Sequence, residues 1–217
     1  MTVPPPPPQQ PEVSPRRLLV TLGGAGALAG ALIVVAFRAT LPAITAYRAR
    51  VLQEAVLEVL HDPARYDTLY VIGGQLAQEP PAGADPAKLQ QIYVGFGSDS
   101  GIAGFAIPAA EPGFADVIRL LFGYDAATGT VLGMKVLENK ETPGLGDKIQ
   151  KDPFVAEFTG ALAPLVGVKP RSGTGDPHEI DMITGVTISS RTVIRAINNA
   201  LDRLRPGLER YVAEHGR

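Results

Sequence analysis

The sequence predicts an α+β protein: one N-terminal transmembrane helix, followed by a domain with an antiparallel sheet and flanking helices. Three observations lead to this prediction. An uncharged apolar run extends from Leu18 to Phe37, short β-like runs separated by turn residues lie between Ile92 and Leu137, and helical patterns follow them. Strands first and helices afterwards favour an α+β arrangement over a parallel α/β sheet.

The composition removes several classes of function. The 217 residues hold 20 Lys and Arg against 22 Asp and Glu, so no basic field attracts a phosphate backbone and we expect no nucleic-acid partner. Cysteine is absent, which removes disulfides and thiolate chemistry. The histidines His61, His178 and His215 lack the spacing of ligands on one helix, so we expect no metal site.

The chain is expected to have three parts. Residues 1–17 contain the run Pro4–Pro8 and little that can enter a core, so this part is predicted to be disordered. Residues 18–37 are predicted to be a transmembrane anchor, because a helix of ~20 residues spans about 30 Å. Residues 38–217 are long enough to form a domain with its own core.

The anchor has a rival interpretation. Arg16 and Arg17 before an apolar run are also typical of a cleaved twin-arginine signal. We favour an uncleaved anchor because the run exceeds the ~7–15 apolar residues of a signal and no small-x-small site follows it. Arginines lie on both sides of the run, so charge does not predict the orientation.

Periodicity and turn residues predict the elements that follow the anchor. Apolar positions from Ala43 to Leu60 recur at helical spacing, and Pro63 ends this helix. Four strands are expected to form an antiparallel meander: Ile92–Phe96, Ile102–Ile107, Val117–Phe122 and Val131–Leu137.

The last third of the chain is predicted to contain two helices, with a loop and a strand between them. A helix is expected from Asp152 to about Leu162, then a loop from Gly167 to Pro177 and a strand from His178 to Ile183. A final helix begins near Ser189 and buries a stripe of apolar residues, namely Val193, Ile194, Ile197, Leu201 and Leu204.

The first candidate motif is Glu141–Ile149, in the order Glu-Thr-Pro-Gly-Leu-Gly-Asp-Lys-Ile. Pro143 restricts one backbone torsion, while Gly144 and Gly146 permit positive φ and close backbone approach. Such a loop can present its amides and the apolar side chain of Leu145 to a ring. An ordinary tight turn explains the same spacing and stays an alternative.

The second candidate motif is Asp181–Ser190, in the order Asp-Met-Ile-Thr-Gly-Val-Thr-Ile-Ser-Ser. Its hydroxyls crowd a strand-to-helix junction, where unpaired amides and the helix dipole favour a phosphate. A plain Ser or Thr helix cap is the alternative. The chain contains neither a phosphate loop of nucleotide triphosphatases nor a dinucleotide fingerprint, so neither kind of site is expected.

Together the two motifs resemble the RnfG family, the FMN-binding subunits of the Rnf ion-translocating electron-transport complex. They are also similar to the related NqrC family of the sodium-pumping NADH:quinone reductase. The resemblance extends from the anchor to about Arg205, through IYVGFGSDSGIAGFAIPA, IRLLFGYDAATGTVLGMKVLENKETPGLGDKI and DMITGVTISS. It implies that residues 38–217 are an extracytoplasmic FMN-binding domain.

The resemblance also implies site residues. In this family the pattern Asp-x-x-Ser/Thr-Gly-Ala-Thr is a flavinylation signal, whose last Thr carries FMN through a phosphoester. Asp181, Thr184, Gly185, Val186 and Thr187 fill this pattern, so a covalent FMN is implied on Thr187. Val186 departs from the family's Ala, and its two extra methyl groups beside the acceptor can crowd the transferase that attaches the flavin. The residues implied to lie against the isoalloxazine ring are Glu141, Thr142, Gly144, Leu145 and Gly146.

The implied function is that of an electron carrier without catalytic residues, because the flavin supplies the redox chemistry. Its complex would pass electrons between ferredoxin and NAD and couple this to movement of Na+ or H+. The implied partners are the other Rnf subunits, an ApbE-like flavin transferase and the lipid bilayer. The resemblance implies a place in the bacterial inner membrane, with the domain on the periplasmic side and residues 1–17 in the cytoplasm.

Two alternatives stay open from the sequence. One is an FMN-carrying electron-transfer domain of another respiratory or reductive membrane system. The other is a flavin-free, membrane-anchored assembly module, for which Val186 in the flavinylation signal is the sequence feature in favour.

Overall fold

The computed structural model describes residues 14–216, which divide into two compact units between Ala49 and Arg50. Helix α1 (Pro15–Val59) begins in the first unit and ends in the second. The run Pro4–Pro8, for which we predict disorder, lies outside the described residues.

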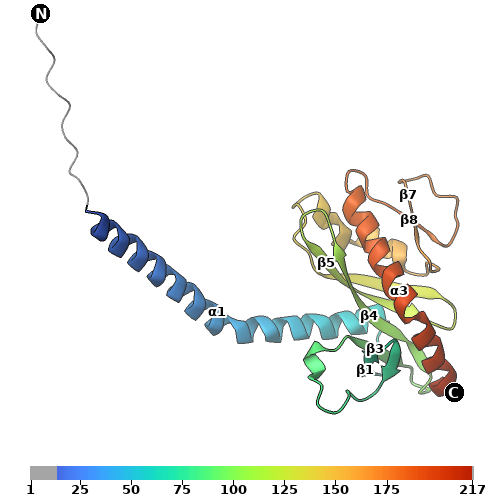
Figure 1. Cartoon of the computed structure of the whole chain (residues 1–217). Coiled ribbons are helices and arrows are strands. Elements are labelled where there is room, and N and C mark those ends of the chain that lie inside the picture. Colours follow the sequence, from blue (N-terminus) through green and yellow to red (C-terminus); the bar gives the residue numbers. More distant parts are fainter. Residues whose placement is uncertain (1–13, 217) are drawn as a thin grey trace, which may run out of the picture. The chain divides into compact units, whose positions relative to one another are not determined.

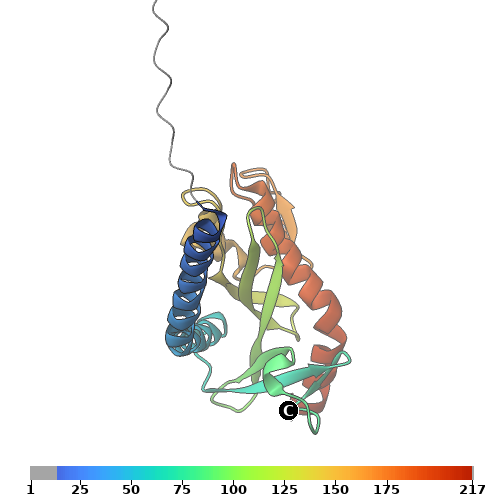
Figure 2. The same ribbon diagram turned by 60° about the vertical axis from the view of Figure 1, so that its left-hand side comes forward.

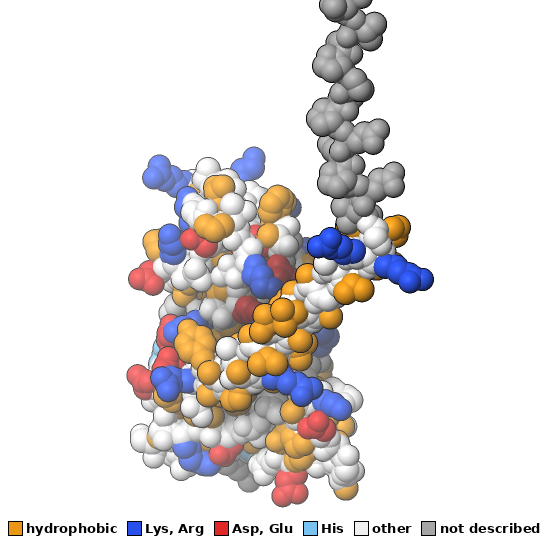
Figure 3. Space-filling view, turned by 90° about the vertical axis from the view of Figure 1, so that its left-hand side faces the viewer, with side chains coloured by type: hydrophobic (Ala, Val, Ile, Leu, Met, Phe, Trp, Pro, Cys, Tyr) orange, Lys and Arg blue, Asp and Glu red, His pale blue; other side chains and the backbone are white. Residues whose placement is uncertain are grey.

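The first unit is the N-terminal part of helix α1. Its apolar side chains are exposed, and none of its most apolar stretch is buried. Figure 3 shows hydrophobic side chains along this helix and basic side chains at its start. The helix is long and apolar enough to cross a membrane, which agrees with the expected anchor.

The second unit is built on an antiparallel sheet (Figure 1). Its strands β3 to β6 are neighbours in chain order, which confirms the expected meander. Strand β4 runs beyond its predicted end because it pairs with β5 as far as Pro112, and β5 runs beyond its predicted end because it pairs with β6 as far as Asp125. The bounds are β3 (Gln91–Phe96), β4 (Ile102–Pro112), β5 (Val117–Asp125) and β6 (Thr130–Glu138).

Two strands absent from the sequence prediction extend this sheet. They are β1 (Arg65–Ile72) and β2 (Gln75–Ala77), and the strand order is β2-β1-β3-β4-β5-β6. Strand β1 has the sequence RYDTLYVI, which mixes polar and apolar residues and in which only Leu69 is fully buried. It therefore contains no apolar run from which a strand could be predicted. Its pairing with β3 over six positions, which only the tertiary structure provides, makes it a strand.

Helices cover both faces of the sheet, and successive side chains of each strand point to opposite faces. Phe105 of β4 packs in the larger core, which contains the buried face of helix α3 (Thr187–His215). Ala106, the next residue, packs in a smaller core with Val56 and Val59 from the last turns of α1. Figures 1 and 2 show α3 running along the sheet.

The segment after β6 is less helical than predicted. The expected helix from Asp152 to about Leu162 is wrong beyond Phe158. The chain turns at Gly160, where φ is +85°, and the Gly160 amide donates to the carbonyl of Val131 at 2.9 Å. This bond to the start of β6 holds Gly160 in the turn, so the helix does not continue beyond Phe158. The short helices are η2 (Gly146–Gln150), α2 (Asp152–Val155) and η3 (Ala156–Phe158), and η1 (Pro86–Lys88) lies earlier, before β3.

A small parallel pair of strands completes the second unit: β7 (Val166–Val168) and β8 (Glu179–Asp181). Strand β8 lies within the predicted strand, whereas β7 occupies the start of the loop predicted from Gly167, so the loop prediction is wrong there. Helix α3 begins at Thr187, before the predicted Ser189. It buries the whole predicted stripe: Val193, Ile194, Ile197, Leu201 and Leu204.

Candidate functional site

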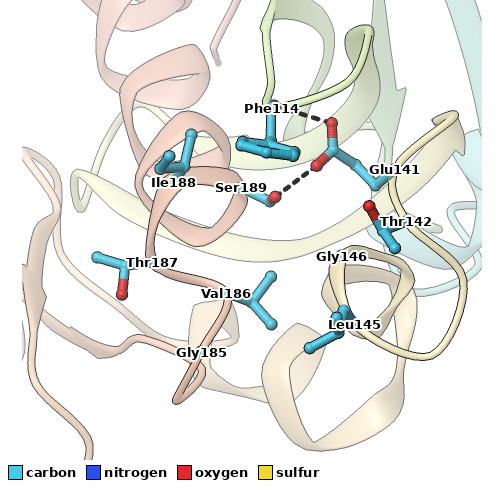
Figure 4. A pocket seen from close by; sticks show the side chains of 10 residues that line it. All are labelled: Phe114, Glu141, Thr142, Leu145, Gly146, Gly185, Val186, Thr187, Ile188 and Ser189. Carbon is cyan, nitrogen blue, oxygen red and sulfur yellow. Dashed lines mark hydrogen bonds between the residues drawn. The ribbon is translucent and has the colours of Figure 1, made fainter.

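A cavity of about 400 Å³ opens in the second unit where three segments meet (Figure 4). These are the turn between β4 and β5, the loop after β6 and the first turn of α3. Both sequence motifs therefore contribute to one site, although they lie far apart in the chain. The volume is in the range of small-molecule sites, ~300–1,000 Å³. The lining residues are Phe114, Glu141, Thr142, Leu145, Gly146, Gly185, Val186, Thr187, Ile188 and Ser189.

A buried carboxylate holds the three segments together. Glu141 is 5% exposed, and its Oε1 accepts hydrogen bonds from the amides of Phe114 at 3.0 Å and Ala115 at 3.1 Å. Its Oε2 accepts a hydrogen bond from the hydroxyl of Ser189 at 2.6 Å. Figure 4 shows this carboxylate between the turn and α3. The three donors offset the cost of burying the polar group.

The loop after β6 folds back on itself and exposes one apolar side chain. The carbonyl of Thr142 accepts hydrogen bonds from the amides of Leu145 at 3.1 Å and Asp147 at 3.4 Å. Gly144 has a φ of +76°, a conformation that favours glycine. Leu145 is consequently presented at the cavity with 49% of its surface exposed. The loop is a tight turn, and it also forms one wall of the cavity.

Helix α3 begins beside the cavity without a side-chain cap. Val186 occupies the N-cap position, and the Ser190 hydroxyl accepts a hydrogen bond from the amide of Ile183 at 3.2 Å. The alternative of a plain Ser or Thr cap is therefore wrong for this motif. The first-turn amides, from Thr187 to Ser189, have no acceptor within the helix and present the positive end of its dipole at the cavity.

The structure brings most of the predicted site residues together. Gly144 and Thr184 belong to the two motifs but do not line the cavity. Asp181 lies in β8, where its Oδ2 accepts a hydrogen bond from the Arg171 amide at 3.1 Å, so it supports a neighbouring loop. The predicted residues that line the cavity are Glu141, Thr142, Leu145, Gly146, Gly185, Val186 and Thr187.

Three lining residues are absent from the sequence prediction: Phe114, Ile188 and Ser189. Ile188 and Ser189 lie inside the second motif. Their position at the predicted start of the final helix was the available signal for them. Phe114 occupies a turn between two strands, where polar residues are usual. An aromatic residue at such a position was the signal that sequence reasoning missed.

An exposed ion pair also joins the β4–β5 turn to the loop. Lys140 Nζ lies 2.8 Å from Asp116 Oδ2. The hydrogen bond from Lys140, followed by that from the Val117 amide, lowers the pKa of Asp116 from 3.8. The same hydrogen bond raises the pKa of Lys140 from 10.5. Solvent screens this pair, so it stabilises the site less than the buried Glu141 does.

Comparison with known proteins identifies the family. The FMN-binding domain model matches residues 113–202, which include every residue that lines the cavity. The RnfG protein of the ion-translocating oxidoreductase complex of Escherichia coli (strain K12) is 31% identical over 165 residues, which cover 71% of this chain and 74% of that protein. The chain belongs to the RnfG family. The RnfG protein of Methanosarcina acetivorans is 28% identical over 186 residues, covering 86% of this chain and 92% of that protein.

Solved structures resemble this member of the RnfG family in fold. NqrC of Shewanella oneidensis has a TM-score of 0.64 at 18% identity and covers 76% of this chain and 99% of its own. The corresponding subunit of the Na(+)-translocating NADH-quinone reductase of Parabacteroides distasonis has a TM-score of 0.52 at 22% identity, covering 65% and 75%. This similarity confirms the predicted α+β fold.

The cavity of this RnfG-family protein fits an FMN by its chemistry. Leu145 and Ile188 offer apolar surface to a flat ring, and the start of α3 favours a phosphate. A Cβ on Gly146 would lie 2.6 Å from the Glu141 Cβ, so only glycine lets the loop approach the carboxylate so closely. Within residues 14–216, no group of three His, Asp or Glu side chains is arranged to hold a metal ion.

Proposed function

We propose that this member of the RnfG family is a one-flavin electron carrier whose FMN is joined to Thr187 by a phosphoester bond. The position of Thr187 carries the proposal, because it is an exposed hydroxyl residue that lines the cavity and begins α3. A phosphate on its Oγ would lie beside the free amides and the positive end of the helix dipole. The family's flavinylation signal indicates the same residue.

The chain's own residues would bind and orient the group. Bound FMN supplies the reversible uptake of electrons. Leu145 and Ile188 would provide the apolar surface that excludes water from the ring, and Glu141 holds the loop against the start of α3. A covalent bond also replaces a binding equilibrium, so the flavin is not lost to a dilute compartment. The carrier then needs no side chain that transfers protons.

The larger assembly is also a proposal. We infer that the chain works as a relay in an Rnf-type complex that couples electron transfer between ferredoxin and NAD to movement of Na+ or H+. The exposed apolar helix supports a single-pass anchor over residues 18–37 in the bacterial inner membrane. Residues 38–217 would then lie on the periplasmic side, where an ApbE-like flavin transferase would attach the FMN, and residues 1–17 in the cytoplasm.

The test is covalent attachment at one residue. The full chain is expressed with a flavin transferase, its intact mass is measured, and any adduct is mapped by peptide fragmentation. We expect one FMN phosphoester on Thr187, and none on the Thr187→Ala variant, whose circular dichroism stays that of the parent because the side chain is exposed. Thr159→Ala is the matched control, since it removes an exposed hydroxyl that belongs to neither motif and does not line the cavity, and it should keep the adduct.

Two outcomes would contradict the proposal. An adduct that persists on Thr187→Ala would assign the acceptor to another residue. An unmodified parent chain, with the transferase shown to act on another acceptor protein in the same cells, would instead favour the flavin-free assembly module.

A further inference from the structure

Phe114 is an aromatic side chain exposed at the edge of the cavity. It is 68% exposed, more than the other large apolar residues of the rim, Leu145 at 49% and Ile188 at 54%. Among the described residues, its ring stacks on no other aromatic ring. An exposed ring of this size retains a large apolar surface that a ligand or partner can cover.

The backbone of Phe114 is nevertheless held firmly. Its amide donates a hydrogen bond to Glu141 Oε1 at 3.0 Å, and the Gly113 amide donates one to the carbonyl of Asp116 at 2.9 Å. A Cβ on Gly113 would collide with Glu141 Oε1, so this part of the turn lies directly against the carboxylate. The exposure of the ring is therefore a consequence of a well-anchored turn and does not reflect a loose segment.

The same carboxylate couples Phe114 to the proposed flavin attachment. Glu141 Oε2 accepts the hydrogen bond from Ser189, which stands in the first turn of α3 together with Thr187. The buried carboxylate thus joins the turn that contains Phe114 to the helical turn that contains Thr187. Figure 4 shows Phe114 and Leu145 on opposite sides of the labelled residues, with the Phe114 ring seen edge-on.

We propose that Phe114 is a cofactor-contact residue, whose ring packs on the isoalloxazine ring and forms the wall of the site opposite Leu145. The inference rests on the proposed function and adds a residue that the sequence motifs do not contain. A flat aromatic ligand suits this wall because aromatic rings gain from stacked or edge-to-face contact in addition to the area they bury. The occupant is the tethered flavin, because Glu141 binds both the turn that contains Phe114 and the first turn of α3, where the flavin would be attached.

The experiment compares flavin spectroscopy in matched variants of the full chain. Phe114→Ala removes the ring, Phe114→Tyr preserves it, and Val166→Ala shortens an exposed apolar side chain away from the cavity. Each chain is loaded with a flavin transferase, and intact mass is measured first. Flavin emission yield, collisional quenching of that emission by iodide, and the midpoint reduction potential are then recorded on the loaded protein.

We expect all four chains to carry FMN. Loss of one aromatic contact shifts the ratio of packed to unpacked ring about two- to tenfold, so Phe114→Ala should raise the iodide quenching constant of the flavin emission. The midpoint potential should move as the ring gains access to water. Phe114→Tyr should restore the parent iodide quenching constant and midpoint potential, and its emission yield should be at or below that of the parent because a phenol in contact with a flavin quenches emission by electron transfer. Val166→Ala should leave all three values unchanged.

The outcomes separate the two proposals. A parent chain without attached FMN contradicts the proposed function. Attached FMN in every chain, with emission, quenching and potential of Phe114→Ala equal to those of Val166→Ala, overturns the role of Phe114 and leaves the carrier function standing. A Phe114→Tyr variant that matches Phe114→Ala in iodide quenching and midpoint potential also overturns it, because the ring itself would then not be the cause.

Discussion

Glu141 is the residue on which the geometry of the site depends most. Its carboxylate is almost fully buried and takes hydrogen bonds from the Phe114 and Ala115 amides and from the Ser189 hydroxyl. The first two donors belong to the β4–β5 turn and the third belongs to α3, so one side chain joins elements that are remote in the sequence. Its removal leaves several donors without their acceptor at once.

We expect Glu141→Ala to lower the free energy of unfolding by about 2–4 kcal/mol, since each orphaned donor loses a charge-assisted bond. The thermal midpoint should fall by about 5–15 °C. Glu141→Gln should fall between the parent and Glu141→Ala, because its amide oxygen accepts only part of these bonds. Glu157→Ala, at an exposed glutamate, is the control and should change stability by less than about 0.5 kcal/mol. Equal midpoints for Glu141→Ala and Glu157→Ala would show that the carboxylate contributes nothing.

Val186 shows how burial changes an expectation formed from the family resemblance. As a departure from the family's Ala, it suggested crowding of the transferase that attaches the flavin. In the structure its side chain is 5% exposed and belongs to the larger core. Figure 4 shows it directed toward Leu145, while Thr187 projects from the other side of the chain.

Val186→Ala should therefore cost about 1–3 kcal/mol of stability through lost burial and a small cavity. The extent of FMN attachment should stay equal to that of the parent, because the removed methyl groups do not face the acceptor. Chemical denaturation and intact mass measure the two effects, and Val166→Ala at an exposed position should change neither. A clear increase in attachment for Val186→Ala would restore the crowding explanation.

At the scale of elements, the site is a junction of a hairpin turn, a loop and a helix start. Two contacts hold the turn to the loop: the buried bonds of Glu141 and the exposed pair between Lys140 and Asp116. In the exposed pair, the hydrogen bond from Lys140 lowers the pKa of Asp116. Because the pKa of Asp116 is lowered on folding, its contribution to stability is present above 3.8 and is lost as the pH falls through the lowered value.

The Asp116→Asn variant should consequently be less stable than the parent near neutral pH, and the difference should shrink as the pH falls below 3.8. High salt should reduce the difference as well, since both side chains are exposed. Thermal midpoints of the two proteins across acidic pH measure this effect. A difference that grows toward low pH would contradict the sign of the shift.

At the scale of the whole molecule, the chain joins an apolar helical unit to a folded unit with its own cores. The first ends at Ala49, and the second holds the sheet, α3 and the site. The apolar stretch of α1 has no buried face, so within the described residues its apolar surface is left for lipid or for another helix. This division agrees with a membrane protein that carries its functional site outside the bilayer.

The absence of cysteine makes the orientation directly testable, because an introduced thiol is unique. We expect Glu157→Cys, on the exposed surface of η3, to react with a membrane-impermeant maleimide applied from the periplasmic side. Thr2→Cys, in the N-terminal tail, should react only after the cells are broken. The reverse pattern would place the folded unit in the cytoplasm.

The sequence by itself determined the chemical character of each part of this protein. The uncharged run Leu18–Phe37 has no polar face at any period, and it lies in a helix that is long and apolar enough to cross a membrane. Strands β3 to β6 could be predicted because their core positions form apolar runs bounded by turn residues. The two motifs that form the cavity were also recognisable, since glycine, proline and hydroxyl residues have specific local uses.

Only the tertiary structure decided which of these residues meet. Strand β1 and the end of the helix after Asp152 depend on hydrogen bonds to partners distant in sequence, which local patterns do not encode. The place of Phe114 in the cavity depends in the same way on long-range hydrogen bonds, because the Glu141 carboxylate accepts one from the Phe114 amide in the β4–β5 turn and another from Ser189. Periodicity reports local preference and burial, whereas long-range pairing selects among the arrangements that those preferences allow.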